Sequence, residues 1–207
     1  FVVGSYHLLK HNKGKGVMIG KMEDIDPRVV TVIGAGVAGT QSILKAQDNR
    51  AHVKVVDSSQ EKLDELKSKY DSNNIEYILS TKDSIQSSIN ESDLVIGSVY
   101  VVGKEAPKVI TKDMLTSMTP GTVMVDVSID QGGCFESSKP TTHDNPTFLE
   151  NDIVHYCVTN MPGAVPLTAT EALNKVSLSY VEYLASKGIK EALESDEHLK
   201  NGLNIMD

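Results

Sequence analysis

The sequence lacks the features of disulfide-rich, zinc-binding and membrane-spanning proteins. It has only two cysteines, Cys134 and Cys157, without CxxC spacing or a pair of histidines spaced to bind zinc. Two cysteines are too few for a disulfide framework, so we interpret them as small buried side chains. No apolar run approaches the ~20 residues that span a bilayer, and no charged segment followed by an apolar core predicts a signal peptide. We therefore expect a cytoplasmic protein with no metal site and no membrane partner.

Positive charge is also scarce. The 20 lysines and arginines are outnumbered by 28 aspartates and glutamates, which leaves a formal net charge of -8. Such a chain has no overall positive field to attract phosphate backbones, which argues against a nucleic-acid partner. Tryptophan is absent and aromatic residues make up 5%, yet the hydrophobic 40% and the charged 23% are ordinary for globular proteins. The 207 residues are enough for one or two domains with a buried core.

Strand-like and helix-like patterns alternate along the middle of the chain. The expected strands are residues 28–33, 52–56, 75–79, 94–99, 122–127 and 153–158. The expected helices are residues 37–47, 59–70, 83–90 and 111–118. This alternation predicts an α/β fold, a doubly wound parallel sheet of the Rossmann type with helices on both faces.

The two ends of the chain differ from this middle part. Residues 1–28 predict a linker helix and a turn rich in Gly and Lys, and residues 29–166 form the predicted α/β domain. Residues 167–207 predict C-terminal helices, a long one over 168–186 and a short one over 191–199. The chain begins with Phe1 rather than Met, inside a predicted helix, so we expect it to belong to a longer protein.

The most informative motif is a glycine-rich turn, Gly34-Ala35-Gly36-Val37-Ala38-Gly39. It follows a buried strand and opens a helix, which is the context of a dinucleotide-binding fingerprint. Gly34 permits the tight turn, Gly36 lets the backbone approach a pyrophosphate, and Gly39 lets the helix lie close to the sheet. Free N–H groups at the start of the helix would bind the anion. The alternative is a glycine-rich turn in some other α/β protein.

An aspartate, Asp57, ends the second predicted strand about 20 residues beyond the glycines, where a carboxylate accepts hydrogen bonds from the adenosine ribose. A 2′-phosphate would be repelled there, and no arginine follows to compensate. Lys62 lies one helical turn further on, at the adenine side. Asp57 therefore favours NAD over NADP, and the alternative role is a strand-end cap.

Two later segments carry a specific resemblance. Residues 123–143 read VMVDVSIDQGGCFESSKPTTH, and residues 155–166 read HYCVTNMPGAVP. They resemble signature segments of bacterial alanine dehydrogenases, a family that is also similar to the NAD-binding subunit of proton-translocating transhydrogenase. The resemblance extends from residue 3 to residue 203 and so covers nearly the whole chain.

The resemblance implies roles for single residues. Asp130 would be catalytic, standing beside the nicotinamide and the substrate, whereas the residues alone leave a turn or capping aspartate equally open. Lys139 matches a position where the family often has arginine, and it keeps the charge but loses the bidentate fork. The remaining implied cofactor contacts are Val37 and Ala38 at the pyrophosphate, Ser80 at the adenine end, Val99 and Tyr100 at the middle, and Val127, Ser128, Ile129, Val158, Thr159, Asn160 and Met161 around the nicotinamide. For the apolar members of this set, a simple core role is the alternative.

The resemblance also implies a reaction, the reversible oxidative deamination of L-alanine to pyruvate and ammonia with hydride transfer to NAD. In the family a preceding domain supplies the substrate-binding arginine, lysine and histidine, so we expect this chain alone to be inactive. The flanking helices would link domains and build a homo-oligomer, a hexamer in the family. Two alternatives remain open, namely a transhydrogenase subunit and a non-catalytic NAD-binding module.

Overall fold

The core of the protein is a seven-stranded sheet, seen in a computed structural model that describes residues 1–101 and 103–205. The strands are β1 (Val29–Ile33), β2 (His52–Asp57), β3 (Ile75–Leu79), β4 (Leu94–Gly97), β5 (Val123–Asp126), β6 (Thr147–Glu150) and β7 (Ile153–Tyr156). Their order across the sheet is β3-β2-β1-β4-β5-β7-β6. All neighbours pair in parallel except β6, which is antiparallel to β7. The predicted doubly wound α/β fold is confirmed.

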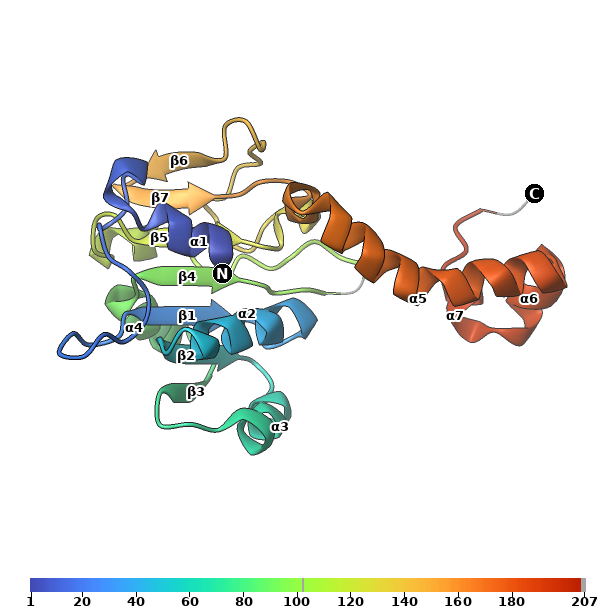
Figure 1. The fold of residues 1–207 in the computed structure, drawn as a ribbon, viewed down its shortest axis with the longest axis horizontal. Helices are drawn as coiled ribbons and strands as arrows, with labels where there is room; N and C mark the ends of the chain where they lie inside the picture. Colours follow the sequence, from blue (N-terminus) through green and yellow to red (C-terminus); the bar gives the residue numbers. More distant parts are fainter. Residues whose placement is uncertain (102, 206–207) are drawn as a thin grey trace. The chain divides into compact units, whose positions relative to one another are not determined.

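Helices cover both faces of this sheet (Figure 1). The α-helices of this part are α1 (Val2–His7), α2 (Val37–Asp48), α3 (Gln60–Tyr70) and α4 (Lys82–Glu91), and the 3-10 helices are η1 (Lys10–Asn12), η2 (Asp113–Ser117) and η3 (Ile129–Gln131). Helices α1 and α2 lie on one face, and α4 lies on the opposite one. Because β2 follows β1 on one side and β4 lies on the other side of β1, the strand order reverses beside β1. In open α/β sheets such a reversal is where ligands bind.

The central strands are apolar because they are buried on both faces. Val30, Val32 and Val95 are fully buried, as expected for parallel strands between two layers of helices. On the α4 face, Ile33, Ile89 and further apolar side chains of η2 and β5 form one cluster. This core holds the carboxyl ends of β1, β4 and β5 in a fixed relation to one another.

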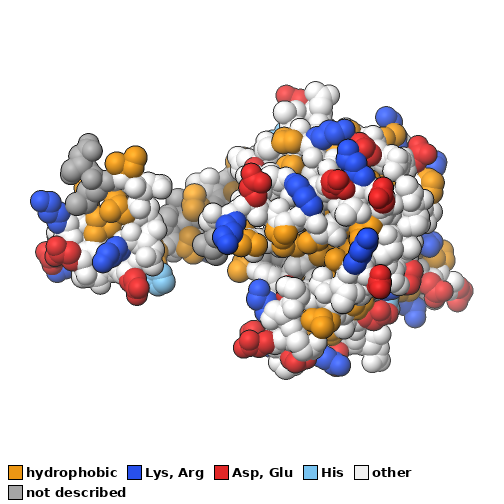
Figure 2. Space-filling view, turned by 180° about the vertical axis from the view of Figure 1, so that it is seen from behind, with side chains coloured by type: hydrophobic (Ala, Val, Ile, Leu, Met, Phe, Trp, Pro, Cys, Tyr) orange, Lys and Arg blue, Asp and Glu red, His pale blue; other side chains and the backbone are white. Residues whose placement is uncertain are grey.

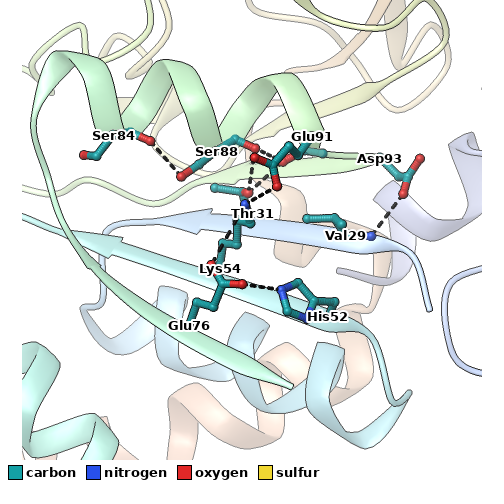
Figure 3. A network of polar contacts seen from close by, with 10 residues as sticks. Val29, Thr31, His52, Lys54, Glu76, Ser84, Ser88, Glu91 and Asp93 are labelled. Atoms are coloured by element: carbon teal, nitrogen blue, oxygen red, sulfur yellow. Dashed lines mark hydrogen bonds and ion pairs between the residues drawn. The ribbon is translucent and has the colours of Figure 1, made fainter. Parts of the chain in front are cut away.

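A polar network crosses the same face towards the amino ends of the strands (Figure 3). The Lys54 ammonium of β2 donates to Glu91 of α4 at 2.5 Å, and the hydroxyls of Thr31 and Ser92 lie 2.6 Å apart. His52 Nε2 lies 2.7 Å from Glu76 Oε1 on β3. These bonds satisfy buried polar groups and join β1, β2 and β3 to α4.

The structure corrects two details of the sequence prediction. Residues 111–118 were predicted as an α-helix, but only the 3-10 helix η2 forms there, ended by Met118 in an extended conformation. Strand β6 was not predicted, because four residues with half-buried and exposed side chains give little apolar signal. The predicted helix at the start of residues 1–28 is α1, which packs on the sheet: a Cβ on Gly4 would stand 2.5 Å from Leu94.

The chain divides by its internal contacts into two compact units, Phe1–Asn160 and Met161–Asp207. The second unit contains η4 (Met161–Ala164), α5 (Pro166–Lys187), α6 (Ile189–Ser195) and α7 (Glu197–Asn201). The predicted long helix is α5. The predicted short helix is divided into α6 and α7. They are separate because Asp196 between them is extended and caps α7, accepting from the Leu199 N–H at 2.9 Å. Among the described residues, no helix has the length and apolar composition needed to cross a bilayer.

Candidate functional site

A pocket of about 710 Å³ opens at the carboxyl edge of the sheet, where the strand order reverses. Its walls are the segments that follow β1, β2, β4 and β5. Ten residues predicted from the sequence line it: Gly34, Gly36, Val37, Ala38, Asp57, Lys62, Val99, Tyr100, Val127 and Ser128. The fold therefore brings together residues that lie up to about ninety positions apart in the sequence.

The glycine turn forms one wall, and each glycine meets a different constraint. Gly34 has φ of +96°, in the left-handed region that favours glycine. A Cβ on Gly39 would stand only 1.8 Å from the carbonyl oxygen of Gly34, so α2 begins in direct contact with the turn. A Cβ on Gly36 would meet nothing within 4 Å. Gly36 is thus open towards the pocket, and the first-turn N–H groups of α2, which have no partner within the helix, lie beside it.

Asp57 closes the same turn from the next strand. Its Oδ2 accepts from the Ala35 N–H at 2.7 Å, and its Oδ1 accepts from the Ser59 N–H at 2.8 Å. The side chain is buried and still lines the pocket. A carboxylate offers about four acceptor positions, so two remain for a ligand. The cap alternative and the ligand role are therefore compatible.

Five residues of the pocket wall were not predicted: Ser58, Ser98, Val101, Pro107 and Gln131. Ser98 matters most, because its buried hydroxyl donates to the Gly34 carbonyl at 2.7 Å and so fixes the turn from β4. A serine near the end of a predicted buried strand, residues 94–99, was the only available signal. Its partner could not be identified without knowing that β4 pairs with β1.

Asp130 lies outside this pocket but beside it. It lines an adjoining hollow of about 460 Å³, which shares Tyr100, Val101 and Gln131 with the larger one. The exposed Asp130 carboxylate accepts from the Asn160 N–H, at 3.2 Å to Oδ1 and 3.4 Å to Oδ2. The two segments that carry the family resemblance therefore meet at this carboxylate.

Several predicted residues do not line the pocket. Lys139 pairs instead with Glu150 at 3.1 Å and lies over the Phe148 ring, 5.2 Å from its centroid. Ile129 and Val158 are buried. The others are Gly39 inside the turn, half-buried Ser80 after β3, exposed Thr159 and Asn160, and Met161 in the second unit. Their cofactor contacts stay predictions.

Comparisons with known proteins agree with this geometry. The family described as "Alanine dehydrogenase/PNT, C-terminal domain" matches residues 1–207. An alanine dehydrogenase of Halomonas elongata is 47% identical over 204 residues, which are 99% of this chain and 55% of that protein. An alanine dehydrogenase of Mycolicibacterium smegmatis is 44% identical over 205 residues, with the same two shares, 99% and 55%. The chain thus spans about half the length of the curated relatives it matches.

Solved structures give the same result. A structure of an L-alanine dehydrogenase superposes with a TM-score of 0.92 at 40% identity, over 99% of this chain and 56% of that chain. A transhydrogenase from Sinorhizobium meliloti matches with a TM-score of 0.74 at 22% identity over 88% of this chain and 51% of that chain, a likeness of fold alone. The chain belongs to the alanine dehydrogenase/PNT C-terminal domain family.

Proposed function

We propose that this chain is the NAD-binding part of an alanine dehydrogenase. The observation that carries the proposal is the open space at Gly36, the N-cap residue of α2. A Cβ on this residue would have no atom within 4 Å. A pyrophosphate at this point would meet backbone N–H groups and the positive end of the helix dipole. The volume of about 710 Å³ is in the range of cofactor sites.

Asp57 is the residue that selects NAD over NADP in this proposal. Its carboxylate keeps free acceptor positions for the two ribose hydroxyls, and its negative charge opposes a 2′-phosphate. Lys62, exposed on α3, lies in the same pocket and stands at the adenine side. We expect its ammonium to soften the discrimination against NADP rather than reverse it.

Asp130 is the catalytic residue of the proposed enzyme. Bound NAD supplies the hydride acceptor, and the protein has to orient the nicotinamide and move the proton of the amine. Asp130 lines a hollow that adjoins the cofactor pocket, and it is exposed to a substrate entering there. In the proposal its carboxylate orients the reacting groups and relays a proton, while residues 127–129 and 158–161 surround the nicotinamide.

The full enzyme interconverts L-alanine with pyruvate and ammonia, and we propose that a further domain supplies the groups that bind the substrate carboxylate. This chain alone then binds NAD and shows little or no turnover. The relatives named alanine dehydrogenase, of which it spans about half, support this assignment. In a full-length protein, NADH oxidation that needs both pyruvate and ammonia would distinguish it from a transhydrogenase or a non-catalytic module. We place the enzyme in the cytoplasm.

The surface of α5 supports a proposal of self-association. None of the 22 residues of this helix is buried, and Leu167, Leu173 and Val176 are at least 64% exposed. Hydrophobic side chains are visible at the surface of this unit in Figure 2, among blue and red ones. Several exposed apolar side chains on a helix without a buried residue are typical of an interface. We propose that it is covered in a homo-oligomer.

The experiment that tests cofactor choice is a titration of this chain with NADH and with NADPH, whose own fluorescence reports binding. We expect the wild type to bind NADH at least about tenfold more tightly, because a 2′-phosphate meets the Asp57 charge. In Asp57→Asn, which keeps the shape and one acceptor oxygen, the ratio should approach one. Asp113→Asn, an exposed aspartate on η2, is the matched control and should leave the ratio unchanged. Equal affinities in the wild type would contradict the role of Asp57.

A further inference from the structure

No role was predicted from the sequence for one carboxylate, that of Asp126 on β5. Asp126 is the last residue of β5, and none of its surface is exposed. A buried carboxylate is costly unless hydrogen bonds replace the water it has lost. The groups that bind Asp126 therefore show what its position requires.

Five donors reach the Asp126 carboxylate. Oδ2 accepts from the Cys134 N–H at 2.8 Å, the Phe135 N–H at 3.3 Å and the Ser138 hydroxyl at 2.5 Å. Oδ1 accepts from the Ser128 N–H at 3.0 Å and from the Cys134 thiol at 3.4 Å. All five donors are neutral groups. One of them lies just after β5 and the others lie eight to twelve residues later, so a single side chain joins both arms of the intervening loop.

The loop is shaped around this carboxylate. Gly133 has φ of +76°, and a Cβ there would stand 2.8 Å from Asp126 Oδ2, so only glycine permits this approach. Burial, followed by the charge of Asp126, raises the pKa of the Cys134 thiol well above its usual value. The thiol therefore stays protonated and remains a donor.

The loop carries the residues of the proposed site. Residues 127–138 include Asp130, and they also include Val127, Ser128 and Gln131 of the pocket wall. The Lys108 ammonium donates to the Gly133 carbonyl at 2.6 Å and to the Gly132 carbonyl. Backbone bonds from residues 106–110 also hold the loop. Among the described residues, Asp126 is the one carboxylate outside the loop that accepts hydrogen bonds from it.

We propose that Asp126 is the positioning residue of this site: by binding both arms of the loop 127–138, its carboxylate sets where Asp130 stands relative to the cofactor pocket. The inference rests on the proposed function of Asp130. Asp126 contacts neither cofactor nor substrate and acts only through the loop. The glycine turn follows β1, and β4 separates β1 from β5, which carries Asp126. Changes at Asp126 should therefore have little effect on the proposed contacts between the glycine turn and the cofactor.

The test compares Asp126→Asn, Asp130→Asn and the double variant in the full-length enzyme that contains this chain. In Asp126→Asn the new side-chain amide would present its own N–H groups to N–H donors, so the loop must move. A displacement of about 1 Å lowers turnover about 100-fold. We expect kcat to fall by about this factor in Asp126→Asn. NADH affinity should fall by a smaller factor, because the loop supplies only part of the pocket wall and the glycine turn stays in place. In the double variant, kcat should be no lower than in Asp130→Asn, because both changes act through one group. Asp113→Asn is the control.

A second readout does not depend on turnover. In Asp126→Asn the one remaining acceptor oxygen can serve only one arm of the loop, so amide hydrogen exchange should speed up at least about tenfold either at Ser128 or at Cys134 and Phe135. If that variant fails to fold, Ser138→Ala removes one of the five donors and should lower kcat about fivefold. An unchanged kcat in Ser138→Ala would then overturn the inference.

The outcomes separate this inference from the proposed function. Unchanged turnover in Asp130→Asn would remove the catalytic role of Asp130 itself. The positioning role alone would be overturned if Asp130→Asn lowered turnover but Asp126→Asn did not. It would also be overturned if the losses in the double variant were fully additive. A loss of thermal stability in Asp126→Asn without any change in kcat would make Asp126 a structural residue only.

Discussion

The glycine turn permits a sharp test, because Gly36 and Gly39 lie three residues apart and should respond to the same substitution in opposite ways. In Gly39→Ala the new methyl group would stand 1.8 Å from the Gly34 carbonyl oxygen and 2.7 Å from Ser98 Oγ. Ordinary contacts are at roughly 3.5 Å, so the turn and α2 have to separate by about 1.7 Å. The obstacle is backbone, which cannot rotate away. In Gly36→Ala the methyl group meets nothing within 4 Å.

The magnitudes follow from these contacts. Overpacking of this kind costs about 1–3 kcal/mol, and the better helix propensity of alanine at Gly39 recovers up to about 1 kcal/mol. We expect a net loss of about 1–2 kcal/mol, which lowers Tm by about 2–8 °C for a chain of this size. At Gly36, φ of -75° suits alanine. Alanine is a poorer N-cap than glycine, which destabilises the fold, but it also lowers the entropy of the unfolded chain, which stabilises the fold. Each effect is about 0.5–1 kcal/mol, so the two nearly cancel at Gly36.

Binding should separate the two variants in the other sense. The methyl group of Gly36→Ala would point into the space proposed for the pyrophosphate, so we expect NADH affinity to fall at least about tenfold, or 1.4 kcal/mol. Thermal unfolding followed by circular dichroism measures stability, and NADH fluorescence measures binding. Wild-type NADH affinity in Gly36→Ala would refute the proposed place of the cofactor. Unchanged Tm in Gly39→Ala would refute the close contact of helix and turn.

Two further predictions concern buried titratable side chains. Burial lowers the pKa of His155, whose Nε2 lies 2.8 Å from the Ser137 hydroxyl. The unfolded chain therefore binds the proton more readily, so stability is complete above about pH 6.5 and falls below it, by up to about 1.4 kcal/mol per pH unit. His155→Gln should flatten this acid slope in urea unfolding, whereas exposed His198→Gln should not; an equal slope in both would contradict the assignment. Burial also raises the pKa of Cys157 to about 11 and that of Cys134 well above its usual value. A thiol reagent at neutral pH should label neither in the folded protein and both in urea, and rapid labelling of the folded chain would show that they are accessible.

Local sequence was sufficient for the first half of the site. The positions of the glycine turn, of α2 and of Asp57 at the end of β2 were predicted correctly, and their cofactor contacts stay predictions. The constraints on the turn are local, because a strand, a residue with positive φ and a helix start follow one another within a few residues. Periodicity likewise identified six of the seven strands. The seventh, β6, escaped because it is short and half-exposed, and the segment at η2 was assigned the wrong kind of helix, because apolar spacing does not distinguish a 3-10 turn from an α-helix.

Tertiary structure alone decided how distant segments bind one another. Three sets of hydrogen bonds depend on which strands are neighbours. Asp57 accepts from Ala35, Ser98 donates to Gly34, and Asp126 accepts from both arms of a loop. The same holds for Lys139, which pairs with Glu150 on β6, a strand that the sequence did not reveal. Hydrophobic patterning depends on the period of a single element and is readable along the chain. A hydrogen bond between two loops depends on distances of a few tenths of an ångström, and only the packed sheet determines them.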